Sequence, residues 1–224
     1  MRSHAGVTAL AILSLALVAC GSGGGAAKVH TPDEVGSALL TASEVGTGWT
    51  QTQRDVFSTR APENPSIDES SWCPAASDRA AALTKLAGGS GADVEFSADQ
   101  PDHDFVGLRE QGWSNTDAAA YFTAAKAAAT ACDGVTWTTA EGTVSMAMVA
   151  DPKFGDASFS WSASAVLSGA STQWRTQNTV VRSGTTILVF QGTDVVSAAS
   201  PPAEPDWSAI AARAAAKFAT LDGG

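Results

Sequence analysis

The chain has 224 residues and carries 23 acidic against 13 basic side chains, for a formal net charge of −10 at pH 7. Such an acidic chain is unsuited to nucleic acid and to anionic lipid head groups, because both select basic surfaces. The length is sufficient for one domain with a sizeable hydrophobic core. Composition therefore favours a solvated protein built around a single folded domain.

The first 19 residues have the order of a signal peptide. Arg2 precedes an apolar run of about 15 residues, which is shorter than the roughly 20 that a membrane-spanning helix needs. The run closes with Leu17-Val18-Ala19-Cys20-Gly21, which resembles the bacterial lipobox, where the cysteine is lipidated and cleavage occurs before it. We therefore expect acyl chains such as palmitate on Cys20. The alternative is an ordinary secretory signal that happens to end in a cysteine.

Residues 20–31 are expected to be the lipidated cysteine and a flexible tether, because glycine, serine and alanine offer little apolar bulk to pack. Lipid on Cys20 would hold the protein at the outer face of the cell membrane, since two acyl chains give stable anchoring. The folded part is then a single domain over residues 32–224, and we expect it to be a monomer.

The two cysteines that remain, Cys73 and Cys132, would lie in an oxidising compartment. A disulfide between them is the default expectation, and two buried free thiols are the alternative. In the chain-entropy account, closing a loop of this size stabilises the fold by roughly 4 kcal/mol.

Several helices and strands are predicted in the first part of the domain. Thr31, Pro32 and Glu34 form a helix start with a capping hydroxyl, a proline and a carboxylate. The expected elements are a helix at 32–40, a helical turn at 43–45, a strand at 50–58, a surface loop at 61–71, an alanine-rich helix from 74 to 87, strands at 92–98 and 105–111 joined by a turn at 101–104, and a helix that begins at Ser114 or Asn115 and ends at Cys132.

The second part of the domain changes to a period of two residues, which is typical of strands with one buried face. Val144, Met146 and Met148 alternate with polar or small residues, and a second alternating segment contains Phe159 and Trp161. Strands at 174–182 and 185–191 flank a hairpin turn at Ser183-Gly184, and a last helix is expected at 206–221. These elements predict an α+β fold, an antiparallel β-sheet flanked by helices.

One family shares this layout. The chain has a lipobox and tether, the segment 39–45 followed by Gly48-Trp49, and two distant cysteines around an alanine-rich helix that contains Tyr121. In these features it resembles the PknH-like extracellular sensor domain, over about residues 32–221. That family occurs as the outer domain of an actinobacterial receptor Ser/Thr kinase and as stand-alone envelope lipoproteins.

The resemblance implies a disulfide-stapled antiparallel sheet with helices, a broad cleft for an unidentified ligand, and no catalytic residues. The kinase's domain has two disulfides, whereas this chain offers one pair of cysteines.

Motifs for catalysis, metal binding and cofactor binding are missing from the sequence. There is no Gly-x-Ser-x-Gly elbow and no phosphate-binding glycine loop. His30 is placed at the end of the tether, which leaves His103 as the one histidine of the domain and disfavours a Ser-His-Asp triad. Asp102-His103-Asp104 is expected to be a solvated turn. We therefore predict no metal and no cofactor.

Tryptophan is the remaining signal, with seven in the chain. Trp161 alternates with other strand residues and is expected in the core. Trp49, Trp72 and Trp113 lie beside loops, so they are the candidate ligand-binding residues, on the surface or in a cleft.

Together these features predict a non-catalytic, membrane-anchored extracytoplasmic lipoprotein with a sensor-like domain that binds a ligand from the cell envelope. One alternative is a hydrolase that acts on the envelope through scattered Asp and Glu residues. Another is a carrier of lipid between membrane and wall, which would need a large apolar cavity.

Overall fold

The computed structural model describes residues 28–60, 73, 88–138, 140, 142–169 and 171–222. The expected signal peptide, Cys20 and the tether up to residue 27 lie outside the described residues. So do the loop at 61–71, Trp72 and the alanine-rich helix at 74–87.

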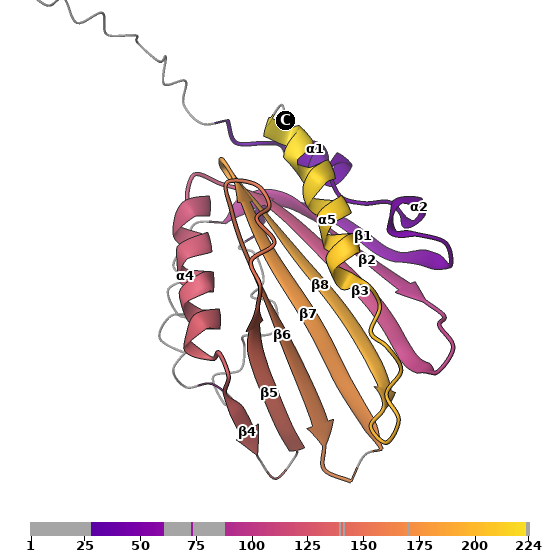
Figure 1. The fold of residues 1–224 in the computed structure, drawn as a ribbon. Coiled ribbons are helices and arrows are strands. Elements are labelled where there is room, and N and C mark those ends of the chain that lie inside the picture. Colours follow the sequence, from indigo (N-terminus) through magenta and orange to yellow (C-terminus); the bar gives the residue numbers. More distant parts are fainter. Residues whose placement is uncertain are drawn as a thin grey trace, which may run out of the picture.

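An eight-stranded antiparallel sheet forms the centre of the described domain (Figure 1). The strands lie in the order β1-β2-β3-β8-β7-β6-β5-β4, so the pairing of β3 with β8 joins the first three strands to the later ones. The strands are β1 Trp49–Arg60, β2 Gly89–Ala98, β3 His103–Ser114, β4 Thr136–Thr138, β5 Gly142–Val149, β6 Ala157–Leu167, β7 Thr172–Ser183 and β8 Thr186–Ser197.

Helices flank this sheet, which confirms the predicted α+β class. They are α1 Pro32–Ser37, α2 Ala42–Val45, α4 Ala118–Ala131 and α5 Trp207–Phe218, and the short 3-10 helix η1 Ala219–Asp222 follows α5. The predicted capping box of α1 is present, because the Thr31 side chain accepts from the Glu34 amide while the Glu34 carboxylate accepts from the Thr31 amide. Among the described residues, no helix is long and apolar enough to cross a bilayer.

Each face of the sheet has its own core, because successive strand residues point to opposite sides. We call the side covered by α1, α2 and α5 the α5 face; its core includes Val35, Leu39, Val94, Phe96, Leu108, Phe190, Trp207, Ile210 and Phe218. The opposite side is the α4 face; its core includes Trp113, Tyr121, Phe122, Phe159, Trp161, Val180, Ile187 and Val189.

The predicted disulfide is confirmed. Cys73 and Cys132 are bonded across a sequence separation of 59 residues, with their Cα atoms 6.1 Å apart. Cys132 is the C-cap residue of α4. The bond therefore fixes the end of α4 to a distant point in the chain, and both cysteines are buried in the core of the α4 face.

Several predicted boundaries differ from the structure, among them the start of α4 and the end of the tether. The N-cap of α4 is Asp117, because Ser114 still pairs with Thr186 in the sheet and the strand must end before the helix can begin. The tether was also drawn too long: His30 is only 2% exposed, and its backbone N–H donates to the Ser114 hydroxyl at 2.9 Å. The ordered domain thus includes residues assigned to the tether.

Candidate ligand-binding groove on the α4 face

Helix α4 packs against β7 and β8, and aromatic side chains differ sharply in exposure along the face that it covers. Phe159 and Trp161 are 2% and 1% exposed in the α4 core. Phe105 and Trp174 point to the same face nearer the other end of the strands and are 46% and 45% exposed. The α4 face therefore has a covered end and an open end.

An apolar row crosses the open end of the face. Phe105 of β3 lies opposite Val195 of β8, which lies opposite Trp174 of β7. Residues directly opposite one another share a face and contact one another. Val195 is 8% exposed between the two rings, so the row consists of two half-exposed aromatic rings on either side of a buried valine.

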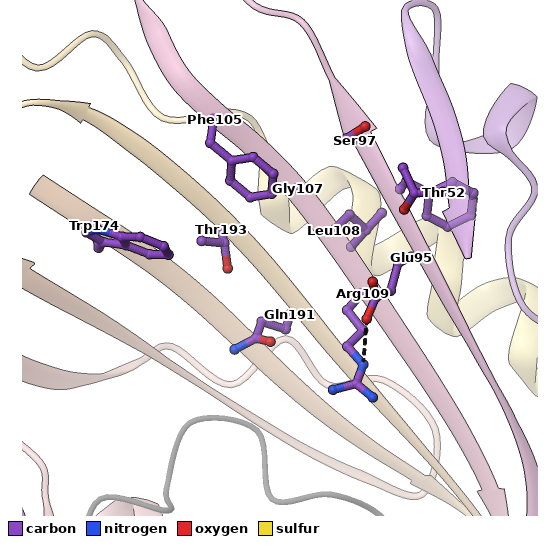
Figure 2. A pocket seen from close by; sticks show the side chains of 11 residues that line it. Thr52, Glu95, Ser97, Phe105, Gly107, Leu108, Arg109, Trp174, Gln191 and Thr193 are labelled. Carbon is purple, nitrogen blue, oxygen red and sulfur yellow. Dashed lines mark ion pairs between the residues drawn. The ribbon is translucent and has the colours of Figure 1, made fainter. Parts of the chain in front are cut away.

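A shallow groove of about 490 Å³ lies beside this row. Figure 2 shows Phe105 and Trp174 on either side of Thr193. The row after Phe105–Val195–Trp174 pairs Gly107 with Thr193, so small residues form the floor of the groove. The lining residues are Thr52, Glu95, Phe96, Ser97, Phe105, Gly107, Leu108, Arg109, Trp174, Gln191 and Thr193.

Gly107 is needed for this arrangement. A Cβ atom at this position would lie 2.5 Å from the Phe105 ring, well inside van der Waals contact. The absence of a side chain lets the ring lie over the β3 backbone. Phe105 is thus held in place on a paired, central strand rather than presented from a loop.

Charge in the groove is balanced. The Arg109 Nε lies 3.0 Å from an oxygen of the buried Asp93 and 3.5 Å from a Glu95 oxygen (Figure 2 draws the Glu95 pair). Arg60 approaches the same Asp93 carboxylate at 3.5 Å. Of these four groups, Arg109 and Glu95 line the groove, so one positive and one negative charge face it.

Two of the three sequence-predicted tryptophans, Trp49 and Trp113, do not line the groove. Trp49 is partly buried on the α5 face, with its ring centroid 6.2 Å from that of Trp207. Trp113 is completely buried beside Tyr121, which corrects our expectation of a surface or cleft position: β3 continues through Ser114 and directs Trp113 into the α4 core. Trp72 lies outside the described residues.

Phe105 and Trp174 were missed as site residues. The sequence did contain a signal for Trp174. It is an even number of residues from the buried Val180 in the same strand, so the two side chains point to the same face of the sheet. The sequence did not indicate how far along the strands the covering helix extends, and that extent decides which of these residues stay exposed.

The two histidines that the structure describes, His30 and His103, also differ from expectation. His30 belongs to the folded domain, as His103 does, and each lies against a carboxylate: His30 Nε2 is 3.1 Å from an Asp222 oxygen, and His103 Nε2 is 3.4 Å from a buried Asp194 oxygen. The His103 side chain is only 6% exposed, so the solvated turn expected at 102–104 does not include it. Its neighbour Asp194 is in turn paired with Arg175.

Neither histidine is arranged as the base of a triad, because a triad needs a hydroxyl or thiol on the ring nitrogen opposite the carboxylate. The second nitrogen of His30 lies 3.8 Å from Glu34, and that of His103 lies 3.0 Å from the Pro101 carbonyl. In the part of the chain that the structure describes, no three His, Cys, Asp or Glu residues are grouped so as to hold a metal ion.

Comparison with known proteins gives a fold but no family. No protein-family model matches the chain, and no curated protein matches its sequence. Among solved structures, the chain is similar to the extracellular domain of PknH from Mycobacterium tuberculosis, with a TM-score of 0.55 and 11% sequence identity. The match covers 87% of this chain and 99% of that domain, so nearly the whole of its fold has a counterpart here.

Proposed function

We propose that this protein is a non-catalytic, lipid-anchored binding domain outside the cytoplasmic membrane, and that its ligand binds in the groove beside Phe105 and Trp174. The observation that carries the proposal is the pair of half-exposed rings, Phe105 on β3 and Trp174 on β7, which lie on either side of β8 in the sheet. Exposed aromatic side chains on central strands contribute little to folding, yet they offer large, ordered surfaces to a ligand.

An extracytoplasmic location is supported by three independent features. These are the signal-peptide order of residues 1–19, the Cys73–Cys132 disulfide, and a fold similar to that of an extracellular domain. Disulfides persist in oxidising compartments. The ligand would then come from the cell envelope, which surrounds a protein anchored at Cys20.

The groove favours binding over hydrolysis. A glycosidase-like mechanism needs one carboxyl group free to donate a proton and a second to act as nucleophile or base. Asp93 and Glu95 are instead both engaged by Arg109. The groove is also open and partly polar, whereas a lipid carrier needs an enclosed apolar cavity.

Anchoring is tested by expressing the Cys20→Ala chain in an actinobacterial host. The variant should leave the membrane fraction and the detergent phase, while the parent chain stays in both. Unchanged partitioning would contradict lipidation at Cys20.

Binding is tested by titrating the secreted Cys20→Ala chain with fractionated envelope lipids and wall fragments while following tryptophan emission. At least one fraction should give a saturable change without being consumed. Adding Trp174→Ala should remove that response, and Val166→Ala should leave it intact, because Val166 is comparably exposed but lies on β6, outside the groove lining. Turnover that scales with protein concentration would overturn the non-catalytic assignment.

A further inference from the structure

We propose that the groove recognises a neutral oligosaccharide, laid across β3, β8 and β7 with two of its sugar rings stacked on Phe105 and Trp174. This inference rests on the proposed function, since it names the ligand class of the same groove. Three properties carry it: the spacing of the rings, the polar groups beside them and the balanced charge.

The two rings suit a chain of flat units. They lie in one row on β3 and β7, with β8 between, so their strands are two spacings or about 10 Å apart. A sugar ring has a face of C–H groups that packs on an aromatic ring, and two units of an oligosaccharide span a comparable length. The buried Val195 and the small Thr193 leave room between the rings for the chain to pass.

Hydroxyl groups line the groove next to the rings. Ser97 of β2 and Thr193 of β8 each contribute one, and Thr52 of β1 adds another at the far side of the groove. A hydroxyl can donate one hydrogen bond and accept others. Sugar hydroxyls need partners of both kinds. An aromatic surface flanked by such groups therefore matches a molecule with apolar faces and polar edges.

Other ligand classes match less well. An extended peptide binds a sheet by adding to an edge, but β3, β8 and β7 are interior strands whose backbones already pair on both sides. Anionic polymers need an excess of basic groups, whereas Arg109 faces Asp93 and Glu95 and the chain has a net charge of −10. The groove's open, partly polar lining offers an acyl chain little enclosure.

The test uses the secreted Cys20→Ala chain and defined probes. These are neutral hexasaccharides of glucose, mannose and N-acetylglucosamine, a sulfated hexasaccharide, vesicles of phosphatidylglycerol and phosphatidylcholine, and a wall polysaccharide extract with and without periodate oxidation, which cleaves sugar diols. Calorimetry and tryptophan emission report binding.

We expect saturable binding of at least one neutral hexasaccharide. If that hexasaccharide has vicinal diols, periodate treatment should also abolish binding of the extract. Trp174→Ala and Phe105→Ala should each weaken the hexasaccharide about tenfold, the upper range for an aromatic stacking contact. Trp174→Leu should behave like Trp174→Ala, because it keeps apolar surface but not a flat ring, while Trp174→Phe should retain most of the affinity. Val166→Ala is the matched exposed control, and melting temperatures verify that all variants fold.

Each other outcome contradicts a specific claim. Trp174-dependent binding of the extract or of vesicles, without binding to any neutral hexasaccharide, overturns the sugar inference and leaves the groove as the ligand site. Hexasaccharide binding that survives both Trp174→Ala and Phe105→Ala overturns the location. Absence of binding to every probe and to the untreated extract overturns the proposed function as well.

Discussion

The covered and open ends of the α4 face are built from the same strands and the same alternation of side chains, yet side chains are buried at one end and exposed at the other. β7 contributes the completely buried Val180 to one end and the 45% exposed Trp174 to the other. Periodicity decides which face a side chain points to, whereas the extent of the covering helix decides whether that side chain becomes core. Large aromatic residues at the open end are therefore free to serve a purpose other than stability.

The difference between the covered and the open end is tested most directly by replacing one tryptophan at each end with alanine and comparing the loss of stability. Trp161 is buried and stacked on Phe159 with ring centroids 5.5 Å apart. Trp161→Ala should lower the free energy of unfolding by about 3–5 kcal/mol, because it leaves a cavity. Trp174→Ala should cost under about 1 kcal/mol, as expected for a partly exposed side chain outside the core.

Urea denaturation followed by circular dichroism measures both values. Equal losses for the two variants would show that the open end is part of the core after all, and would weaken the argument for a ligand site there.

The disulfide tests the covered end in another way. Replacing both Cys73 and Cys132 by alanine removes the link that fixes the end of α4, and should cost roughly 4 kcal/mol if the loop-closure account holds. At about 2–4 °C per kcal/mol for a chain of this size, the melting temperature should fall by roughly 10 °C. Neither Cys73 nor Cys132 lines the groove, so ligand binding at low temperature should persist.

Mass measurement of the unreduced, denatured protein after alkylation provides the control. No added label is expected on Cys73 and Cys132 in the exported protein, and two labels would mean that the bond does not form there.

On the α5 face, the helices cover the sheet so completely that the carboxyl group of Glu110 is buried. Glu110 is 0% exposed, and one of its oxygens accepts a hydrogen bond from the Leu40 N–H at 2.9 Å. Burial raises the pKa of Glu110 from 4.5 to about 7, against the opposing effects of the Leu40 hydrogen bond and the charges of Lys217 and Arg54. The folded state therefore holds this proton more tightly than the unfolded state does.

The sign of the pH effect follows from that difference. Stability from the protonated Glu110 is present below pH 4.5 and is lost as the pH rises through about 7, an effect of about 3 kcal/mol. Glu110→Gln keeps the acceptor for Leu40 without the charge, so it should be more stable than the parent chain at pH 8 and should lose that advantage at pH 4.5.

Denaturation of both proteins across this range measures the difference. The other carboxylates, including Glu34 and Glu44 with pKa values lowered to about 2, are common to both proteins and cancel. An advantage that does not change with pH would show that Glu110 is not the responsible group.

Local signals in the sequence predicted the local structure well. The capping box at Thr31, the hairpin between β7 and β8 and the pairing of Cys73 with Cys132 each depend on neighbouring residues or on a count of cysteines. The hairpin turn itself is Gly184-Thr185, one residue later than the predicted Ser183-Gly184, because Ser183 still pairs with Thr186. The sheet and its α+β class followed from alternation. These features need no knowledge of how distant segments pack.

Long-range packing explains what the sequence did not reveal. Trp113 and Trp174 are both strand residues on the same face, but Trp113 is buried against Tyr121 of α4, whereas Trp174 is 45% exposed. His30 follows a glycine-rich segment and looks like tether, but its partners Ser114 and Asp222 lie 84 and 192 residues away in the chain.

The docking of the N-terminal segment also sets the orientation of the molecule. Lys28 and His30 are hydrogen-bonded to Thr185 and Ser114, where β8 begins and β3 ends. The groove lies toward the opposite end of the same strands: the nine residues from Ser114 back to Phe105 span about 30 Å. A lipid on Cys20 would therefore attach the domain by the pole far from the groove.

Even fully extended, residues 20–27 reach at most roughly 29 Å. The groove would then face away from the bilayer, toward polymers of the wall. The short segment 20–27 would limit how far the domain can lie from the lipid surface to which the protein is attached.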